Sequence, residues 1–470
     1  MSSATGATPI SAAPAHGTSS VFVIGLLASL AGLMFGLDIG VISGAQSFIQ
    51  KDFHISDHAL EWIVSSMMAG AAVGAVGCGW LSSSLGRKRS LILGGLLFVI
   101  GSLGCALAPA PPILIVGRFV LGVAIGIASY TAPLYIAEIA PEAIRGRMIS
   151  TYQLMITSGI LVAFLSDTAF SYSGSWRWML GVIAVPGMLF LVGLFALPDS
   201  PRWLMMRGEK QTAREVLMRL RGGERGQVDK EIADIEEQLK QPQMGFALFR
   251  QNANFRRSVW LGVLLQAMQQ FTGMNVVMYY APRIFQAMGY ATEAQMWFTA
   301  LVGLTNVLAT LIAMAVIDHW GRKPTLYTGF AVMAIGLGVV GTMMMGGAPS
   351  SHGMQLFTVI MLLVFIVGFA MSAGPLIWTL CSEIQPLKGR DFGIAASTFT
   401  NWVTNMIVGA TFLSLLNGIG TAQTFWLYGG FNVLFLLLTF LLIPETKGVT
   451  LEHIESRLMA GEKLRDIGRQ

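Results

Sequence analysis

Stretches of about 20 mostly apolar residues recur along the whole chain, and no other feature constrains the fold as strongly. An apolar helix of that length crosses the hydrocarbon core of a bilayer, where the backbone must satisfy its own hydrogen bonds. Only 12% of the 470 residues are charged, about half the share in a typical soluble domain. The sequence therefore predicts an all-α integral membrane protein with twelve transmembrane helices, which begin near Val21, Trp62, Ser90, Ile113, Met148, Trp178, Arg257, Met296, Thr325, Leu356, Phe392 and Thr424.

Basic residues are concentrated in every second connection between the predicted spans, at positions 87–89, 145–147, 322–323 and 388–390. Because cytoplasmic loops are rich in Lys and Arg, these connections, the long central loop and both termini are predicted to be cytoplasmic. Residues 1–20 contain no Lys or Arg, so they lack the basic region of a signal peptide and are expected to form a disordered tail. The net charge of +5 reflects this topology, and no nucleic-acid partner is expected.

Three local patterns occur twice with nearly the same spacing. Gly-Arg-Lys at 86–88 returns at 321–323, an offset of 235 residues. Glu-x-x-Pro-x-x-x-Arg at 138–145 returns at 383–390, an offset of 245, and Pro-Asp-Ser-Pro at 198 has a counterpart in Pro-Glu-Thr-Lys at 444, an offset of 246. Such repeats predict two pseudo-symmetric six-helix halves with a substrate site between them, near the middle of the bilayer.

A polar linker separates the two predicted halves. Within it, Lys230 to Lys240 predicts an amphipathic helix with Ile232, Ile235 and Leu239 on one face. This helix is either part of a cytoplasmic helical bundle that latches one half to the other or a solvated linker. The predicted segments are an N-terminal tail (1–20), a first half (21–198), the helical linker (199–255), a second half (256–444) and a C-terminal tail (445–470).

Four side-chain amides lie in one apolar stretch, at Gln266, Gln269, Gln270 and Asn275. The three glutamines share roughly one helical face, and Gly273 allows the helix to bend before Asn275. An amide both donates and accepts hydrogen bonds, so several amides in one cavity suit a neutral polyhydroxylated ligand. Amides can also serve only to join helices. Four of them on one bent helix favour ligand binding.

Asp38 is predicted to be the only acid well inside an apolar span, and Arg118 the only base at comparable depth. A charge there costs about 2.5–3.5 kcal/mol, so it needs a partner or a function. The first span runs outward and the fourth inward, which places both residues in the outer half, where they can meet. The pair is either a static ion pair or a proton switch, and spacing alone does not decide between these hypotheses.

Taken in order, the motifs resemble those of the sugar porter family of the major facilitator superfamily, and they cover essentially the whole transmembrane region. They are Phe-Gly-Leu-Asp at 35–38, Gly-Arg-Lys at 86–88, Pro-Glu-x-x-Arg-Gly at 141–146, Pro-Asp-Ser-Pro-Arg-Trp at 198–203, Gln-Gln-x-x-Gly-x-Asn at 269–275, Gly-Pro-x-x-Trp at 374–378 and Pro-Glu-Thr-Lys at 444–447. One departure is Ser83, which stands where the family's loop usually has Asp, whereas the second half keeps Asp318. We do not assign the role of the missing acid to Ser83.

The resemblance implies a major facilitator fold and a sugar site. It favours the proton switch, with Asp38 as proton acceptor and Arg118 as modulator of its proton affinity. The sugar-binding residues that it implies are Gln153, Gln269, Gln270, Asn275, Asn306, Trp378, Asn401 and Trp402. Amides suit the ring hydroxyls, and an indole face covers the C–H face of a pyranose.

Gating residues are expected on both sides of that site. Tyr279 is expected to act as an outer lid, and Tyr280 as a membrane-interface aromatic. Gly374 and Pro375 are expected to break the tenth helix so that it can swing. On the cytoplasmic side the expected set is Glu138, Arg145, Glu383, Arg390, Asp318 and Arg322.

The matched charges in the two halves predict a cytoplasmic latch. Glu138 is predicted to pair with Arg390, and Glu383 with Arg145, while the site faces outward. Solvated loop charges are the alternative, because surface pairs contribute only about 0–1 kcal/mol. Repetition with complementary signs favours the latch.

The predicted function is proton-coupled hexose symport by alternating access, with galactose and glucose as leading substrates on resemblance alone. A facilitative uniporter is the first alternative, and a non-transporting sugar sensor or a membrane enzyme are others. No cofactor, metal or ATP-binding loop is expected, and the proton is the coupling ion. The expected setting is the bacterial cytoplasmic membrane, with lipids around a monomer.

Overall fold

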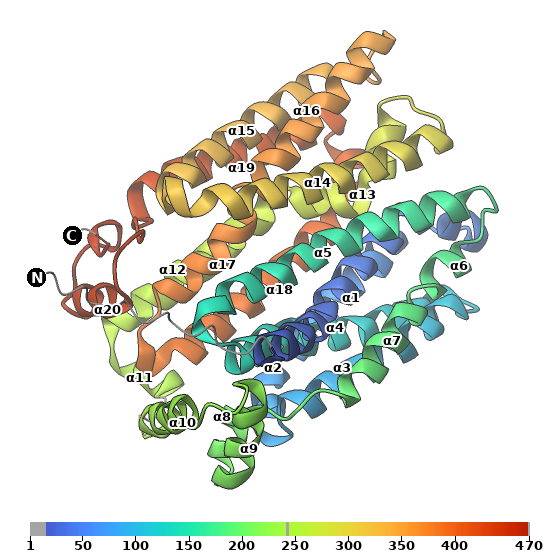
Figure 1. Cartoon of the computed structure of the whole chain (residues 1–470). Coiled ribbons are helices and arrows are strands. Elements are labelled where there is room, and N and C mark those ends of the chain that lie inside the picture. The colour runs from blue at the N-terminus through green and yellow to red at the C-terminus, as the bar shows by residue number, and fades with distance from the viewer. Residues whose placement is uncertain (1–15, 241–243, 469–470) are drawn as a thin grey trace, which may run out of the picture.

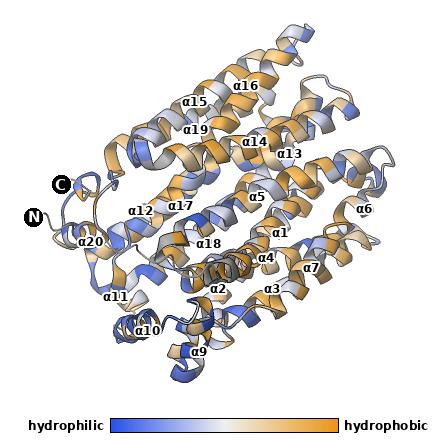
Figure 2. Ribbon diagram, viewed as in Figure 1, coloured by the Kyte–Doolittle hydropathy of each residue, from blue (hydrophilic) through white to orange (hydrophobic). Residues whose placement is uncertain are grey.

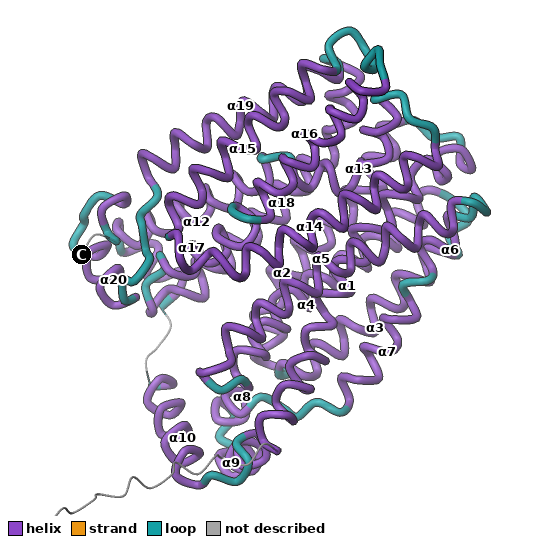
Figure 3. The backbone as a smooth tube through the Cα atoms, turned by 45° about the horizontal axis from the view of Figure 1, so that its top comes forward, coloured by secondary structure: helices purple, strands orange, loops and turns teal. Residues whose placement is uncertain are grey.

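The computed structural model describes residues 16–240 and 244–468, and of residues 16–20, 142, 143, 317 and 318 it describes the backbone alone. Within these ranges every regular element is a helix, and the long helices run side by side as a tilted bundle (Figure 1; Figure 3). The predicted all-helical architecture is confirmed.

The first six spans form one half of the bundle. Their helices are α1 (His16–Phe53), α2 (Asp57–Ser84), α3 (Arg87–Ala106), α4 (Pro111–Ile139), α5 (Glu142–Ser171), α6 (Trp176–Gly181) and α7 (Ala184–Phe195), of which α6 and α7 together make the sixth span. The last six spans form the other half. Their helices are α12 (Ala253–Phe271), α13 (Met274–Ala287), α14 (Thr292–Trp320), α15 (Arg322–Met343), α16 (His352–Ala370), α17 (Ala373–Glu383), α18 (Arg390–Gly418) and α19 (Thr421–Leu442).

Eleven segments in the described ranges are long and apolar enough to cross a membrane. The seventh span is absent from that set because the four amides of its apolar stretch lower its mean hydropathy. It is also divided into α12 and α13 at Gly273, whose backbone φ is +92°. Glycine adopts this left-handed conformation without the Cβ clash that other residues suffer. The predicted bend at Gly273 is confirmed, and it falls within the amide-rich stretch.

Glycine residues bring the helices of the first half into direct backbone contact. A Cβ added to Gly122 of α4 would lie 1.9 Å from the carbonyl oxygen of Met67 on α2, and one added to Gly36 of α1 would lie 2.0 Å from that of Ile156 on α5. Small residues permit such close crossings in membranes, where packing drives helix association. These crossings fix α1 beside α5 and α4 beside α2.

The central linker forms a small helical domain with its own core. Its helices are α8 (Pro201–Met206), α9 (Lys210–Leu220), α10 (Arg225–Leu239) and α11 (Gly245–Gln251). The predicted amphipathic helix is present as α10, and Ile232 is buried against α8 and α9 together with Trp203 and Leu217. A hydrogen bond from Lys210 on α9 lowers the pKa of Glu236 on α10.

The linker contacts both halves. Arg221 donates to the carbonyl oxygen of Ile139 at the end of α4 (3.0 Å), and the backbone NH of Met244 donates to that of Lys388 (2.9 Å). The helices α8 to α11 and the C-terminal α20 (Leu451–Met459) lie at one end of the bundle, which we call the linker side (Figure 1). The short 3-10 helix η1 (Leu387–Gly389) contacts α11, and the second one, η2 (Leu464–Asp466), contacts α19. The opposite end is the far side.

Candidate transport site

Three amides from α12 and α18 form a hydrogen-bonded cluster between buried helices. The Nδ2 of Asn401 on α18 donates to the Oε1 of Gln266 (2.6 Å) and to that of Gln269 (2.9 Å). Close by in sequence, Asn275 donates to Gln270 (2.5 Å) across the bend at Gly273. Gln266 belongs to this cluster although the resemblance did not assign it to the sugar site.

The amide cluster is attached to the break in the tenth span. The Nε2 of Gln269 donates to the carbonyl oxygens of Ala373 (2.9 Å) and Gly374 (3.0 Å), which lie in the first turn of α17. The helix breaks at Met371 and Ser372, just before the Gly-Pro pair that was expected to break it. Proline is tolerated in a first turn, so Pro375 sits where α17 starts. A change at Gln269 can therefore be transmitted to α17.

The other predicted sugar residues are more dispersed. Trp402 is buried and its ring lies 5.3 Å from that of Phe35 on α1, a contact between the two halves. Asn306 is buried on α14, Gln153 is half-buried on α5, and Trp378 is 40% exposed on α17. Among the described residues, no hydrogen bond joins the side chains of these four residues to the amide cluster. Their roles stay predictions.

The two tyrosines of α13 are both fully buried. The hydroxyl of Tyr279 accepts from Asn405 (3.0 Å), and its carbonyl oxygen accepts from Gln46 of the first half. The expectation that Tyr280 is a membrane-interface aromatic is wrong. The non-helical backbone at Tyr280, ahead of Pro282, turns its ring inward, where the hydroxyl donates to the carbonyl oxygen of Gly409 (2.6 Å).

Asp38 and Arg118 meet in the protein interior, as their predicted depth requires. The Nη1 of Arg118 donates to the Oδ1 of Asp38 at 2.5 Å, and neither side chain is exposed. The Oδ2 of Asp38 and the Nε and Nη2 of Arg118 have no hydrogen-bond partner among the described residues. A static buried pair is stabilising only when its remaining hydrogen-bonding positions are satisfied. Asp38 can instead accept a proton on Oδ2 while Oδ1 keeps its contact.

The expectation that Asp38 is the only acid deep in a span is wrong. Asp167 is buried in α5, where its Oδ2 accepts from the backbone NH of Gly44 on α1 (3.0 Å), and Glu61 is buried in α2. Both were missed because the spans extend further than hydropathy suggests: α5 continues to Ser171 and α2 already begins at Asp57.

Hydrogen bonds join the two halves on the far side. Arg283 of α13 donates to Gln50 (2.7 Å) and to Asp57, and Asp57 also accepts from Asn417 of α18 (2.8 Å). One turn along α2, the carboxylate of Glu61 accepts from the backbone NH (2.7 Å) and the hydroxyl (2.6 Å) of Ser414. On the linker side, the described residues form no hydrogen bond or ion pair between α1–α7 and α12–α19.

The three repeated motifs converge on the linker side, once in each half. In the first half Arg87 pairs with Glu138 (2.7 Å), which also accepts from the hydroxyl of Ser200. In the second half Arg322 pairs with Glu383 (3.0 Å), which accepts from the hydroxyl of Thr446 (2.6 Å). We call these sets the first-half and second-half charge clusters.

The predicted pairing of charges across the halves is not present. Arg145 and Arg390 donate to the backbone carbonyl oxygens of Ala140 and Gln385 in their own halves, each at 3.4 Å. Glu138 and Glu383 are each engaged by an arginine and a hydroxyl of the same half. The cross-pairing was predicted for the state in which the site faces outward, and for that state it stays a prediction. The side chain of Asp318 lies outside the described residues. The Ser83 hydroxyl donates within its own helix, to Trp80 (2.9 Å).

The Glu138→Gln variant is expected to lose about 3 kcal/mol of stability, because it leaves Arg87 buried without its counter-charge. Only 7% of the Arg87 side chain and 5% of the Glu138 side chain are exposed. The measurement is the melting temperature of the purified protein in detergent. Glu237→Gln is the matched control, since it breaks an exposed pair with Lys240 and should melt like the wild type. Equal melting of all three proteins would contradict a structural role for the first-half charge cluster.

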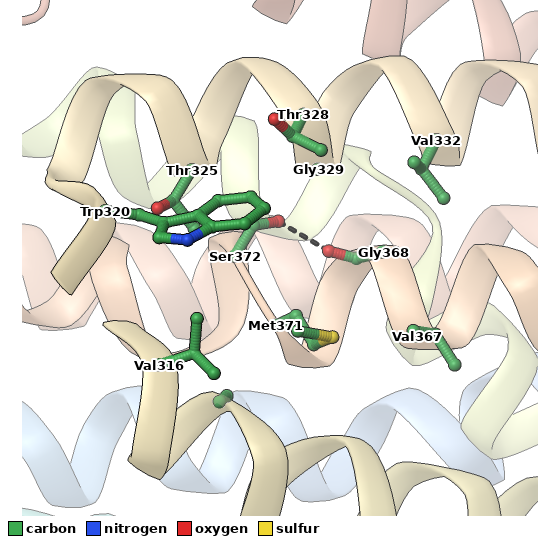
Figure 4. Close-up of a pocket in the computed structure, with 11 residues that line it drawn as sticks. Val316, Trp320, Thr325, Thr328, Gly329, Val332, Val367, Gly368, Met371 and Ser372 are labelled. Atoms are coloured by element: carbon green, nitrogen blue, oxygen red, sulfur yellow. Dashed lines mark hydrogen bonds between the residues drawn. The ribbon is translucent and has the colours of Figure 1, made fainter. Parts of the chain in front are cut away.

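A small cavity of about 140 Å³, which no residue of the amide cluster lines, lies between α14, α15 and α16 (Figure 4). Trp320, Val316 and Val332 line it, and so does Met371 at the helix break (Figure 4). The Ser372 hydroxyl turns back to the carbonyl oxygen of Gly368 (2.5 Å). The other hydroxyls of the lining, those of Thr325 and Thr328, also donate to backbone carbonyl oxygens one turn away. The lining is otherwise apolar, so this cavity is less suited to a sugar than the amide cluster is.

A two-half helical bundle with an amide cluster and a buried acid-base pair defines a membrane transporter of the major facilitator class. Residues 24–458 match the family model described as "Sugar (and other) transporter", and the chain belongs to this family.

The relatives of the chain include sugar-proton symporters. The chain is 64% identical to the galactose-proton symporter of Escherichia coli K12 over 95% of this chain and 96% of that protein. It is 58% identical to the arabinose-proton symporter of the same strain, over 95% of each chain. Among solved structures, the partially occluded inward open conformation of the xylose transporter XylE from E. coli matches with a TM-score of 0.81 at 31% identity, covering 92% of this chain and 100% of that one.

Proposed function

We propose that the protein takes up a hexose together with a proton by alternating access across the bacterial cytoplasmic membrane. The observation that carries the proposal is the buried contact of Asp38 with Arg118 in a chain 64% identical to a galactose-proton symporter. Galactose and glucose are the leading substrates. A pentose is the second candidate, because the arabinose-proton symporter is 58% identical.

We assign the sugar to the space between α12, α18 and their neighbours. Its hydroxyl groups would replace the contacts that Asn401 makes with Gln266 and Gln269 (2.6 and 2.9 Å), and Trp402 would cover a ring face. Because Gln269 also holds the first turn of α17, sugar binding would be felt at the break in the tenth span.

We assign the linker side to the cytoplasm and the far side to the exterior. The support is the concentration of basic residues in the linker-side connections. In this topology, hydrogen bonds of Arg283 and Glu61 join the two halves on the outer side, as in a state that faces inward. The cycle then requires the far-side contacts to break, and the two charge clusters would keep each half rigid as it moves.

The Arg283→Gln variant is expected to raise the population of the state that is open on the far side by about tenfold. The variant removes a charge-assisted hydrogen bond between the halves, and such a bond contributes about 1.5 kcal/mol. The measurement is the distance between spin labels on Cys substituted at Ser173 and Ser350, in far-side loops of the two halves, with the three buried native cysteines in place. We expect a larger fraction of long distances.

Arg177→Gln is the matched control, because it also removes a far-side cation but one that contacts only its own half, through Asp52 and the carbonyl oxygens of Ala106 and Ala108. Identical distance distributions in Arg283→Gln and the wild type would show that this contact does not hold the far side closed.

External pH during sugar addition tests the proposed function. De-energised, lightly buffered cells that express the protein receive galactose, glucose, arabinose or xylose. Alkalinisation with one sugar would support proton symport and identify the substrate. If labelled sugar equilibrates while the pH stays constant, the protein is a uniporter. If no sugar enters, a sensor is the better hypothesis.

A further inference from the structure

A basic pocket lies on the linker side, where α19 ends. Its volume is about 480 Å³, and it is lined by Arg257, Leu441, Leu442, Lys463, Leu464 and Arg465. Three of these residues are cations and three are leucines, so the lining combines positive charge with apolar surface. The pocket is remote in sequence from Asp38, and no lining residue belongs to the amide cluster.

The pocket has a fixed frame. Arg257, near the start of α12, donates to the carbonyl oxygen of Glu462 (2.6 Å), and Asn254 donates to that of Met459 (2.9 Å). These bonds hold the segment after α20 against α12. Ile454, Leu458 and Ile467 bury their side chains together beneath the same segment. Lys463 and Arg465 are therefore presented from an ordered part of the chain.

The pocket lies at the boundary between the apolar and polar zones of the protein. Phe440 and Leu441, in the last turn of α19, are 60% and 53% exposed. Large apolar side chains exposed on a transmembrane helix face lipid tails. Immediately beyond them the chain is hydrophilic, and Figure 2 shows the same change of colour from the bundle to the region around α20. This is the depth of lipid headgroups.

The charge of the pocket is only partly balanced. Asp466 lies 3.7 Å from Arg465, and Glu462 pairs with Arg457 (2.8 Å). Lys463 is exposed and forms no ion pair with the described residues. Together with Arg257, it leaves an excess of positive charge directed at the membrane surface. Guanidinium and ammonium groups donate strong, charge-assisted hydrogen bonds to phosphate oxygens.

We propose that this pocket binds the headgroup phosphate of an anionic phospholipid, with an acyl chain along Leu441 and Phe440. A free anion would use only the cations of the lining, whereas a phospholipid also uses the leucines. The linker-side leaflet is the cytoplasmic one under the proposed topology, and clusters of Lys and Arg next to transmembrane helices are attracted to anionic lipid there. The bound lipid would stabilise the junction between α12, α19 and the C-terminal segment.

The test compares binding of phosphatidylglycerol and phosphatidylcholine to the full-length protein by native mass spectrometry from detergent. The wild type should bind phosphatidylglycerol in preference. Removing two cations in Lys463→Gln/Arg465→Gln should weaken phosphatidylglycerol binding about 25-fold, at about fivefold for each surface cation. The charge-conserving Lys463→Arg/Arg465→Lys should keep the preference.

Arg225→Gln/Lys230→Gln is the matched control, because it removes two exposed cations of α10 that do not line the pocket. Equal binding of phosphatidylglycerol by the wild type and Lys463→Gln/Arg465→Gln would overturn the proposal, and so would equal losses in that variant and the control. Thermal stabilisation by inorganic phosphate equal to that by phosphatidylglycerol would assign the pocket to a free anion instead. The test measures lipid binding and thermal stability and does not measure sugar uptake. A negative result would therefore contradict the lipid site without contradicting proton-coupled sugar uptake.

Discussion

The Asp38→Asn variant is expected to lose sugar accumulation while it still exchanges labelled sugar across the membrane. Asparagine has the shape of a protonated aspartate, but it can neither take up nor release a proton. The buried contact with Arg118 joins only one carboxylate oxygen, at 2.5 Å, and an amide oxygen can replace it. The halves should therefore still move with sugar bound, although the proton gradient no longer drives them.

The expected effect is large. One charge moved through 100 mV supplies about 2.3 kcal/mol, which corresponds to about 50-fold accumulation of the coupled sugar. In the variant the internal concentration should only reach the external one. The measurements are steady-state accumulation in energised cells, exchange in de-energised vesicles, and the alkalinisation that accompanies sugar addition, which should disappear.

Asp229→Asn serves as the control for loss of an acid. Asp229 is exposed on α10 and pairs with Arg214 (2.7 Å), far from the amide cluster in the chain, so accumulation should be unchanged. Uphill accumulation by Asp38→Asn would assign the proton to another carboxyl, and the buried Asp167 and Glu61 would be the residues to replace next. Loss of exchange together with accumulation would return the pair to a static structural role.

The sequence predicts the fold well because lipid imposes a strong rule on it. Most spans must be apolar over their length, so eleven of the twelve are apparent from hydropathy, and the amide-rich seventh was recognised from its place between two charged connections. Depth along a helix is fixed by the rise of 1.5 Å per residue, which is why the meeting of Asp38 and Arg118 could be predicted from two distant segments. The bend at Gly273 could be predicted because glycine permits a positive φ.

The contacts that depend on conformation could not be predicted in the same way. The latch between Glu138 and Arg390 was inferred from complementary charges, but a sequence does not specify which state of a moving protein is populated. In this structure the halves meet through Asp57, Arg283 and Ser414 on the far side. Asp57 and Ser414 belong to none of the repeated motifs. The backbone NH of Ser414 is one of the donors, and every residue type except proline has such an NH, so the sequence gives no sign of this contact.

Span ends were a source of error. Hydropathy places the start of the second span near Trp62, whereas α2 begins at Asp57. Glu61 therefore fell just outside the predicted span, although its carboxylate is buried and contacts Ser414. The other missed acid, Asp167, lies opposite Gly44, where a Cβ at position 44 would lie 2.3 Å from the Oδ2 of Asp167. A glycine on the first span is therefore the sequence signal that could have indicated this buried acid.

The Gly122→Leu variant is expected to reduce the yield of folded protein by about tenfold or more, because overpacking at a rigid contact costs several kcal/mol. A Cβ at this position would lie 1.9 Å from the carbonyl oxygen and 2.8 Å from the carbonyl carbon of Met67. These are backbone atoms of α2, which cannot move aside as a flexible side chain can. The helices α2 and α4 would have to separate.

Gly77→Leu isolates the steric cause. Gly77 is exposed on α2, and a Cβ there would meet nothing within 4 Å. Both substitutions raise helix propensity, so a propensity effect would act in the same direction in both. Fluorescence-detected size-exclusion chromatography of tagged protein should show a monodisperse peak for Gly77→Leu and a lost or aggregated peak for Gly122→Leu. Equal peaks would mean that α2 and α4 can separate without cost.

Separation of α2 from α4 would also disturb the proposed proton site. Arg118 lies one turn before Gly122 on α4, and its contact with Asp38 requires α4 to stay beside α1. The smaller Gly122→Ala substitution should therefore fold in part and show weaker coupling: sugar exchange close to that of the wild type, with less accumulation per unit of proton gradient. Full accumulation by folded Gly122→Ala would show that the Asp38–Arg118 contact tolerates a shift of α4.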